Sequence, residues 1–169
     1  MDFQQSRAGL APPWDINVVV EIPLRGDGVF SPPSFQPGNF GFVPRTAMAD
    51  GEPCEVLVVG SVSVLPGAIL RSRPIGLAEL ADDEGGAGQL RLLAVPVQRL
   101  HPFFAGTTSL ESLPSVLLDQ AERFFVSVRD LLRPRSLRLA RWGGAEEAAA
   151  VVERAIAAWR PGEASGAGV

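Results

Sequence analysis

The order of the expected elements places this chain of 169 residues in the α+β class. Apolar and β-branched runs bounded by Gly and Pro predict strands first, and a helix, a strand and a second helix follow. Segregation of this kind favours a small antiparallel barrel or sheet covered by helices. We expect a single domain over 14–160, a flexible lead-in over 1–13 and a flexible tail over 161–169.

Short apolar segments predict the strands, and Gly/Pro-rich segments separate them. The expected strands are 17–23, 56–60, 68–72, 75–80, 89–96 and 136–142. The acidic, glycine-rich stretch 82–88 predicts the turn of a hairpin, and the Gly/Pro/Ser-rich stretch 24–38 predicts a long loop.

Two segments near the C-terminus have helical spacing. The first begins at Ser112-Leu113-Pro114, with the proline in the first turn, and the second follows Gly143-Gly144. Their apolar residues recur at three- and four-residue spacing, which predicts one buried face on each helix. The expected buried residues are Leu117, Ala121, Phe124, Val128 and Leu131 in the first helix and Val151, Val152, Ala155, Ile156 and Trp159 in the second.

Composition excludes several classes of protein. With 46% hydrophobic and 20% charged residues the chain is globular, and no apolar run is long enough to cross a membrane. A net charge of −4 without a basic cluster argues against a nucleic-acid partner. The single Cys54 cannot form an internal disulfide, which favours a cytoplasmic location. All fifteen basic residues are arginines and tyrosine is absent, so neither an ammonium nor a phenol is available for catalysis.

Negative charge gathers at one point of the sequence. Asp50, Glu52 and Glu55 lie within six positions, directly before an apolar strand. Carboxylates this close are costly unless water, a cation or a basic partner compensates them. An isolated acidic turn is usually a solvated surface turn, so the flanking segments decide its meaning.

Those segments carry a resemblance to a known family. They are V-V-V-E-I-P at 18–23, G-N-F-G-F-V-P-R-T-x-x-x-D-G-E-P-x-E-V-L-V at 38–58, L-P-G-A-I-L-R-S-R-P-I-G at 65–76, the D-D-E turn and R-L-L-A-V-P at 91–96. In this order and spacing the chain resembles the family I soluble inorganic pyrophosphatases from about Trp14 to Trp159. The resemblance implies a five-stranded, oligonucleotide-binding-like (OB-like) barrel with two main helices. It also implies a homo-oligomer, a hexamer or a trimer.

The resemblance further implies which residues form the site. In this family carboxylates hold several Mg²⁺ ions, and basic and phenolic side chains bind the phosphates. The implied metal ligands are Asp50, Glu55, Asp82 and Asp83. The candidate acid/base residues are Glu52, Asp50 and Glu21. The candidate substrate-binding residues are Phe40, Phe42, Arg45, Arg91, Val128 and Arg129.

Several positions depart from the family pattern. Glu52 and Glu55 stand where the family has aspartates, Gln89 lies near a missing acid, and Arg91 replaces a lysine. Tyrosines of the family become Gln36, Phe40 and Phe42, and its Tyr-Lys pair becomes Val128-Arg129. Because a displacement of about 1 Å can cost on the order of 10²-fold in rate, we expect inefficient pyrophosphate hydrolysis and weak or lost Mg²⁺ binding.

Three functions follow as hypotheses. The leading one is a pyrophosphatase-fold enzyme repurposed for small-molecule biosynthesis, with carboxylate acid/base chemistry in an apolar pocket. The alternative is a Mg²⁺-dependent inorganic pyrophosphatase that works with these substitutions. The third is an inactive structural or regulatory paralogue.

Overall fold

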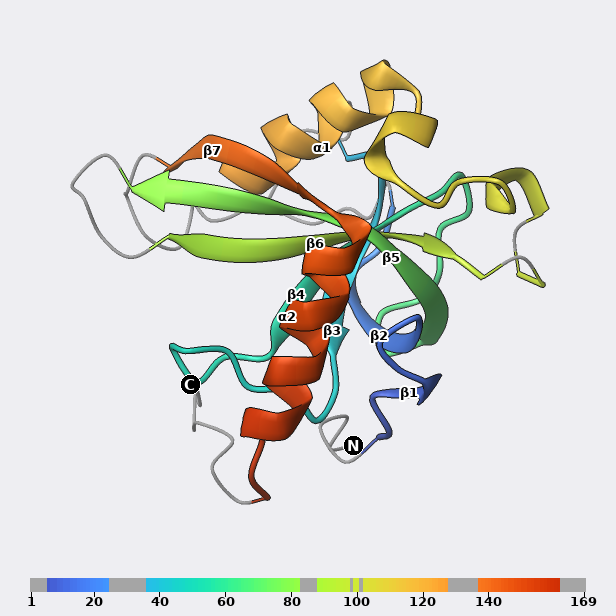
Figure 1. The fold of residues 1–169 in the computed structure, drawn as a ribbon. Helices are drawn as coiled ribbons and strands as arrows, with labels where there is room; N and C mark the ends of the chain where they lie inside the picture. The colour runs from blue at the N-terminus through green and yellow to red at the C-terminus, as the bar shows by residue number, and fades with distance from the viewer. Residues whose placement is uncertain are drawn as a thin grey trace.

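The computed structural model describes residues 6–24, 36–82, 88–97, 99–100, 102–127 and 137–161. Figure 1 shows one curved sheet with two helices packed against it. The strands are β1 (Gly9–Ala11), β2 (Asp15–Ile22), β3 (Gly38–Val43), β4 (Cys54–Val59), β5 (Ile69–Asp82), β6 (Gln89–Pro96) and β7 (Leu137–Gly144). The helices are α1 (Ser115–Ser127) and α2 (Ala145–Ala158), with short 3₁₀ turns η2 (Pro102–Phe104) and η3 (Leu110–Ser112).

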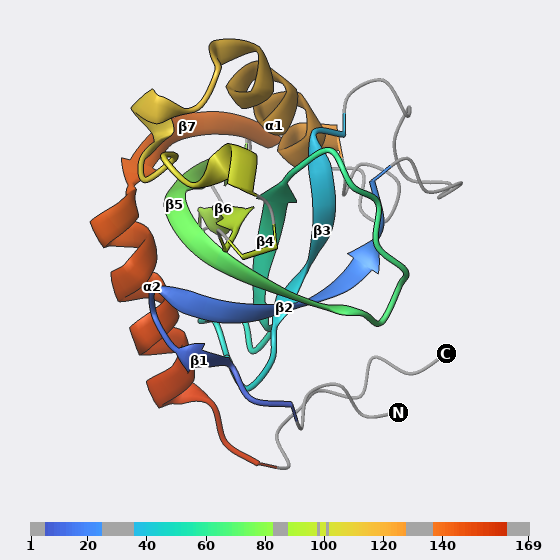
Figure 2. The same cartoon turned by 90° about the vertical axis from the view of Figure 1, so that its right-hand side faces the viewer.

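Five of the strands close into a ring, which confirms the expected OB-like fold. The sheet order is β1-β2-β3-β4-β6-β5-β7, and an additional pairing of β2 with β5 closes the ring (Figure 2). The ring is mixed rather than purely antiparallel, because β4 runs parallel to β6. Strand β6 pairs antiparallel with β5 on its other side.

Strand β5 shapes the ring. The sequence predicts two strands separated by Pro74, whereas the structure has one continuous strand over 69–82. Its first part pairs with β2 and its second part with β7, and its register against β6 shifts between Pro74 and Gly76. Proline lacks an N–H and is accommodated at such irregularities, so it bends the strand instead of ending it.

The sequence does not predict two of the strands, β3 and β1. All six residues of β3 are buried, and their Gly and Asn content hides the strand from propensity arguments. A Cβ on Gly41 would lie 1.9 Å from the carbonyl oxygen of Val19, so only glycine allows β2 to approach here. The short β1 pairs with β2 inside the stretch expected to be a loose lead-in.

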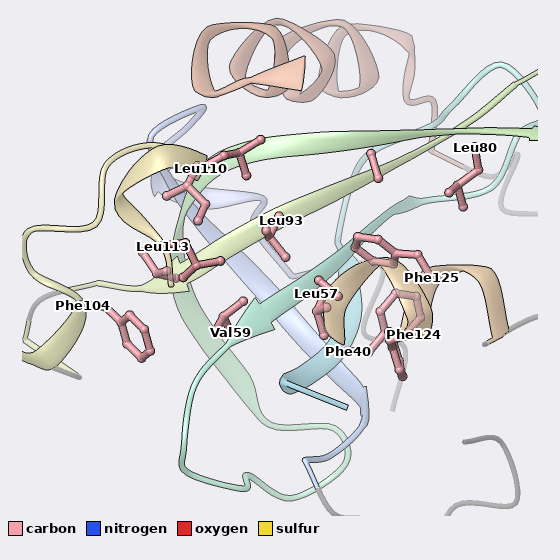
Figure 3. Packing of buried hydrophobic residues seen from close by; sticks show 14 residues of the cluster. Phe40, Leu57, Val59, Leu80, Leu93, Phe104, Leu110, Leu113, Phe124 and Phe125 are labelled. Atoms are coloured by element: carbon pink, nitrogen blue, oxygen red, sulfur yellow. The ribbon is translucent and has the colours of Figure 1, made fainter. Parts of the chain in front are cut away.

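The two helices cover different sides of the ring (Figure 2). Successive residues of a strand point to opposite faces, so β4 contributes to two apolar clusters. Leu57 and Val59 belong to the first cluster, to which α1 adds Ala121, Phe124 and Phe125 (Figure 3). Val56 and Val58 pack in the second cluster, to which α2 adds Ala148, Val151, Val152 and Ala155. In the described segments, no helix has the length and apolar character required to cross a membrane.

Candidate functional site

A buried ion pair joins the end of the acidic motif to strand β6. Glu55 Oε2 lies 2.9 Å from Arg91 Nη1, with the Arg91 side chain 1% exposed and the Glu55 side chain 20% exposed. Arg91 Nη2 also donates a hydrogen bond of 3.0 Å to Gln89 Oε1. The parallel register, which pairs Val56 with Leu92, brings these residues of β4 and β6 together. The structure therefore places two predicted site residues in contact and adds Gln89 to them.

The two predicted aromatic residues have different surroundings. Phe42 is buried and lies directly opposite Glu55 in the β3–β4 register, so the two side chains are neighbours on one face of the sheet. Phe40 belongs to the apolar cluster under α1, where its ring meets that of Phe124 edge-on at 5.3 Å (Figure 3). Phe40 is therefore part of the core between the sheet and α1.

The acidic turn between β3 and β4 holds Asp50 and Glu52 in solvent. Gly51 has φ +82°, a left-handed conformation that suits glycine. Asp50 Oδ1 accepts a hydrogen bond of 3.1 Å from the backbone N–H of Glu52, and Met48 N–H donates to Glu52 O at 2.8 Å. Backbone geometry thus fixes the turn, while both carboxylates stay exposed.

The segment that precedes this turn, which includes Arg45, contacts the C-terminal end of α2. The φ of +54° at Arg45 is unusual for a residue with a side chain, and the Arg45 guanidinium lies 5.7 Å from the ring centre of Trp159. Ala47 N–H donates to Ala155 O near the C-terminal end of the helix, at 2.9 Å. The structure therefore places the guanidinium of Arg45 beside Trp159, at the end of α2.

The remaining predicted acids stand at strand ends. Glu21 is exposed near the end of β2, and Asp82 is half-buried at the last position of β5. Gln36, which stands where the family has a tyrosine, fixes the chain at the end of β2, close to Glu21 in the sequence. Its Nε2 donates to the carbonyl oxygens of Ile22, Pro23 and Gly38 at 2.8–3.2 Å. Asp83, Val128 and Arg129 lie outside the described residues.

The donor set decides whether a metal ion fits. Within the ranges that the structure describes, no three His, Cys, Asp or Glu side chains are grouped to hold a metal. Magnesium usually keeps several waters and binds one or two protein carboxylates together with substrate phosphates. Asp50 and Glu52 are exposed and Glu55 is partly exposed, so each offers an oxygen donor of the kind that such an ion binds.

Cys54 is not suited to nucleophilic chemistry. Burial, and secondarily the negative charge of Glu55, raises the pKa of its thiol to about 12. At pH 8 a pKa of about 12 leaves only about one thiol in 10⁴ ionised, and the thiolate is the reactive form. We expect a thiol-specific disulfide reagent to label Cys54 in denaturant and to leave the folded protein unlabelled at pH 8. Rapid labelling without denaturant would contradict the buried position of Cys54.

A small cavity lies away from these residues. It has a volume of about 170 Å³ and is lined by Asn39, Gly60, Val62, Val64, Leu70, Pro96 and Leu100. Its lining includes neither Phe40 nor Phe42, so the aromatic residues expected to form an apolar pocket do not contribute to this one.

Comparison with known proteins gives the family. A family model described as inorganic pyrophosphatase matches residues 19–160. An inorganic pyrophosphatase of Caulobacter vibrioides is 37% identical, covering 92% of this chain and 96% of its own. One of Pseudomonas aeruginosa is 34% identical, covering 95% and 99%. The solved structure of an inorganic pyrophosphatase from Coxiella burnetii is 30% identical, with a TM-score of 0.76 over 92% of this chain and all of the other. The chain belongs to the inorganic pyrophosphatase family.

The hypothesis of an enzyme repurposed for small-molecule biosynthesis is wrong. The relatives that match nearly the whole chain are named inorganic pyrophosphatases, which fits the alternative of a Mg²⁺-dependent pyrophosphatase better. The hypothesis relied on an apolar pocket formed by aromatic replacements, whereas Phe40 packs in the core against Phe124.

Proposed function

We propose that this protein hydrolyses inorganic pyrophosphate to two phosphates in a reaction that depends on Mg²⁺. The observation that supports this most strongly is the relationship along almost the entire chain to proteins named inorganic pyrophosphatase. The exposed acidic turn and the neighbouring Glu55 supply oxygen donors of the kind that Mg²⁺ prefers.

The proposed metal-binding residues are Asp50, Glu55, Asp82 and Asp83. When bound, Mg²⁺ polarises phosphoryl oxygens and lowers the pKa of a coordinated water. Asp50 and Glu55 flank Glu52 in the sequence. The hydrogen bond from the Glu52 amide to Asp50 fixes the turn that carries Asp50 and Glu52, and Glu55 follows in β4. The metal requirement itself belongs to this proposal.

The carboxylates of Glu52, Asp50 and Glu21 are the candidates that take up the proton of the attacking water. In the overall step a water oxygen bonds to one phosphorus and the bridging P–O bond breaks. The proton of the water passes to the carboxylate and the leaving phosphate departs with the bonding electron pair. A positioned base of this kind typically contributes 10²–10⁴-fold to the rate. Exposure of Glu52 on the turn leaves it accessible to a substrate from solution.

Arginine supplies the positive charge that a pyrophosphate site requires. Arg129 and Arg45 are the candidates for a direct phosphate contact, whereas the buried Arg91 forms an ion pair with Glu55. Phe42 lies opposite Glu55 in the β3–β4 pair and places an apolar side chain beside it. A homo-oligomeric state, implied by the family resemblance, and a cytoplasmic location, favoured by the single cysteine, are part of the same proposal.

A phosphate-release assay tests the proposal. With Mg²⁺ and pyrophosphate we expect turnover of about 1–10³ per second, the usual range for enzymes. Chelation of Mg²⁺ with excess EDTA should abolish release, and added Mg²⁺ should restore it. A folded protein that releases no phosphate with either Mg²⁺ or Mn²⁺ would contradict the proposal and favour an inactive paralogue.

A further inference from the structure

Arg91 has surroundings that separate it from an ordinary phosphate-binding arginine. We propose that Arg91 is a positioning residue that fixes the carboxylate of Glu55 for metal binding and does not bind phosphate itself. The role assigned to Glu55 rests on the proposed pyrophosphatase function. The inference depends on the burial of Arg91 and on the identity of its contacts.

Burial removes Arg91 from the reach of a substrate. Its side chain is 1% exposed, and it is among the largest fully buried side chains in the described part of the chain. A guanidinium at this depth is costly unless an opposite charge or hydrogen-bond acceptors compensate it. Glu55 on β4 forms an ion pair with Nη1 at 2.9 Å, and Gln89 Oε1 on β6 accepts a hydrogen bond of 3.0 Å from Nη2. A tetra-anion arriving from solution would have to displace these contacts to reach the guanidinium.

Glu55 has the complementary placement. Its side chain is 20% exposed, so it contacts the buried Arg91 and is also accessible to solvent. It directly precedes Val56, which is buried in β4, and strand geometry fixes its backbone. With the backbone and one carboxylate oxygen both held, the direction of the carboxylate is set before any cation binds.

The planar fork of arginine is what makes two contacts possible. Nη1 contacts Glu55 and Nη2 contacts Gln89, in two directions that belong to one rigid group. Lysine would keep the positive charge but could not reproduce this geometry. Arg91→Lys therefore removes the positioning while it preserves the charge. Arg91→Met removes both.

Magnesium binding, measured by titration calorimetry without substrate, gives a direct test. We expect Arg91→Lys to weaken Mg²⁺ binding about 10–100-fold, the usual cost of losing a partner that orients a metal ligand. We expect kcat to fall by a similar factor and the KM for pyrophosphate to stay within about twofold, because ground-state substrate contacts are unchanged. Gln89→Leu, which removes one of the two contacts, should shift Mg²⁺ binding in the same direction by less.

Two further variants test whether Arg91 acts on Mg²⁺ binding through Glu55. In a Glu55→Gln background, Arg91→Lys should no longer change Mg²⁺ binding, because the group that it orients has lost its charge. Arg71→Lys is the control for the chemical change, since Arg71 makes a two-point pair with Asp15 at the more exposed β2–β5 contact, outside the acidic motif. This control should leave both Mg²⁺ binding and kcat unchanged.

The opposite pattern would overturn the inference. If Arg91 binds phosphate, Arg91→Lys should bind Mg²⁺ normally and Arg91→Met should raise the KM for pyrophosphate more than tenfold. An effect of Arg91→Lys that persists without the Glu55 charge would also reject positioning. If Arg91→Met fails to fold, Mg²⁺ binding by Arg91→Lys and Gln89→Leu still distinguishes positioning of Glu55 from direct phosphate binding. A wild-type chain that shows the coupled Mg²⁺ binding but hydrolyses no pyrophosphate would reject only the proposed function, whereas one that binds no Mg²⁺ would reject both.

Discussion

Replacement of Glu52 by Gln is expected to lower kcat for pyrophosphate about 10²–10⁴-fold, the contribution of a positioned acid/base group. The substitution keeps the size of the side chain and removes its ability to accept a proton. Because Glu52 is exposed on a turn that backbone contacts define, the free energy of unfolding should change by less than about 0.5 kcal/mol. Steady-state kinetics and urea denaturation of the same preparation would measure both effects.

A matched variant controls for the loss of one negative charge. Glu153 is exposed on α2, and Glu153→Gln makes the same chemical change on another element. We expect this control to retain wild-type kcat and stability. If Glu52→Gln keeps full activity, then Glu52 is not the base, and Asp50→Asn and Glu21→Gln become the variants to compare.

Replacement of Phe124 by Ala is expected to lower the free energy of unfolding by about 3–5 kcal/mol, the usual cost of removing a buried phenyl ring. Phe124 is fully buried at the centre of the contact between α1 and the sheet. Its ring packs edge-on against Phe40 at 5.3 Å and lies 6.2 Å from that of Phe125 (Figure 3). A cavity there would remove contacts on both sides. Urea denaturation, analysed as a two-state transition, would measure the loss.

Phe103 provides the control for this experiment. Its side chain is 76% exposed, although its ring touches that of Phe104 at 5.0 Å. Phe103→Ala should change stability by less than about 1 kcal/mol, since little apolar surface is buried there. Equal effects of the two substitutions would mean that α1 is not held by the cluster around Phe124.

The sequence predicts most of the fold because local patterns and long apolar runs agree. The run at 17–23 appears as β2, and the hairpin around the acidic turn appears as β5 and β6. Strand β3 was not predicted because Gly38, Asn39 and Gly41 have low β-propensity. The glycines allow close backbone approach, and Asn39 makes side-chain hydrogen bonds. The two predicted strands form one strand, β5, because they pair with β2 and β7. These pairings join distant segments, so a local sequence pattern does not predict them.

The site is less predictable than the fold. Comparison of motifs identified Glu55 and Arg91 as site candidates, but their contact arises from the parallel pairing of β4 and β6, which no local pattern encodes. Gln89 and Gln36 looked like losses, since each replaces a residue of the family. Each makes hydrogen bonds that position a neighbour, and only the three-dimensional arrangement reveals this. Gln89 and Gln36 are both polar residues near a predicted site, at positions where the family has a different polar residue. That substitution pattern is the sequence signal that could have identified them.

The closing contact of the ring also bears on the order in which the protein folds. Residues Ile16 to Val19 pair with Ile69 to Ser72, so strands β3 and β4 lie between the partners along the chain. Pairings between distant segments carry a larger loop-closure entropy and form later than hairpins such as β5–β6. We infer that the ring closes late in folding. Until it closes, β2 and β5 present unpaired backbone groups that can be captured by another chain, which makes this seam the point most exposed to misassembly during synthesis.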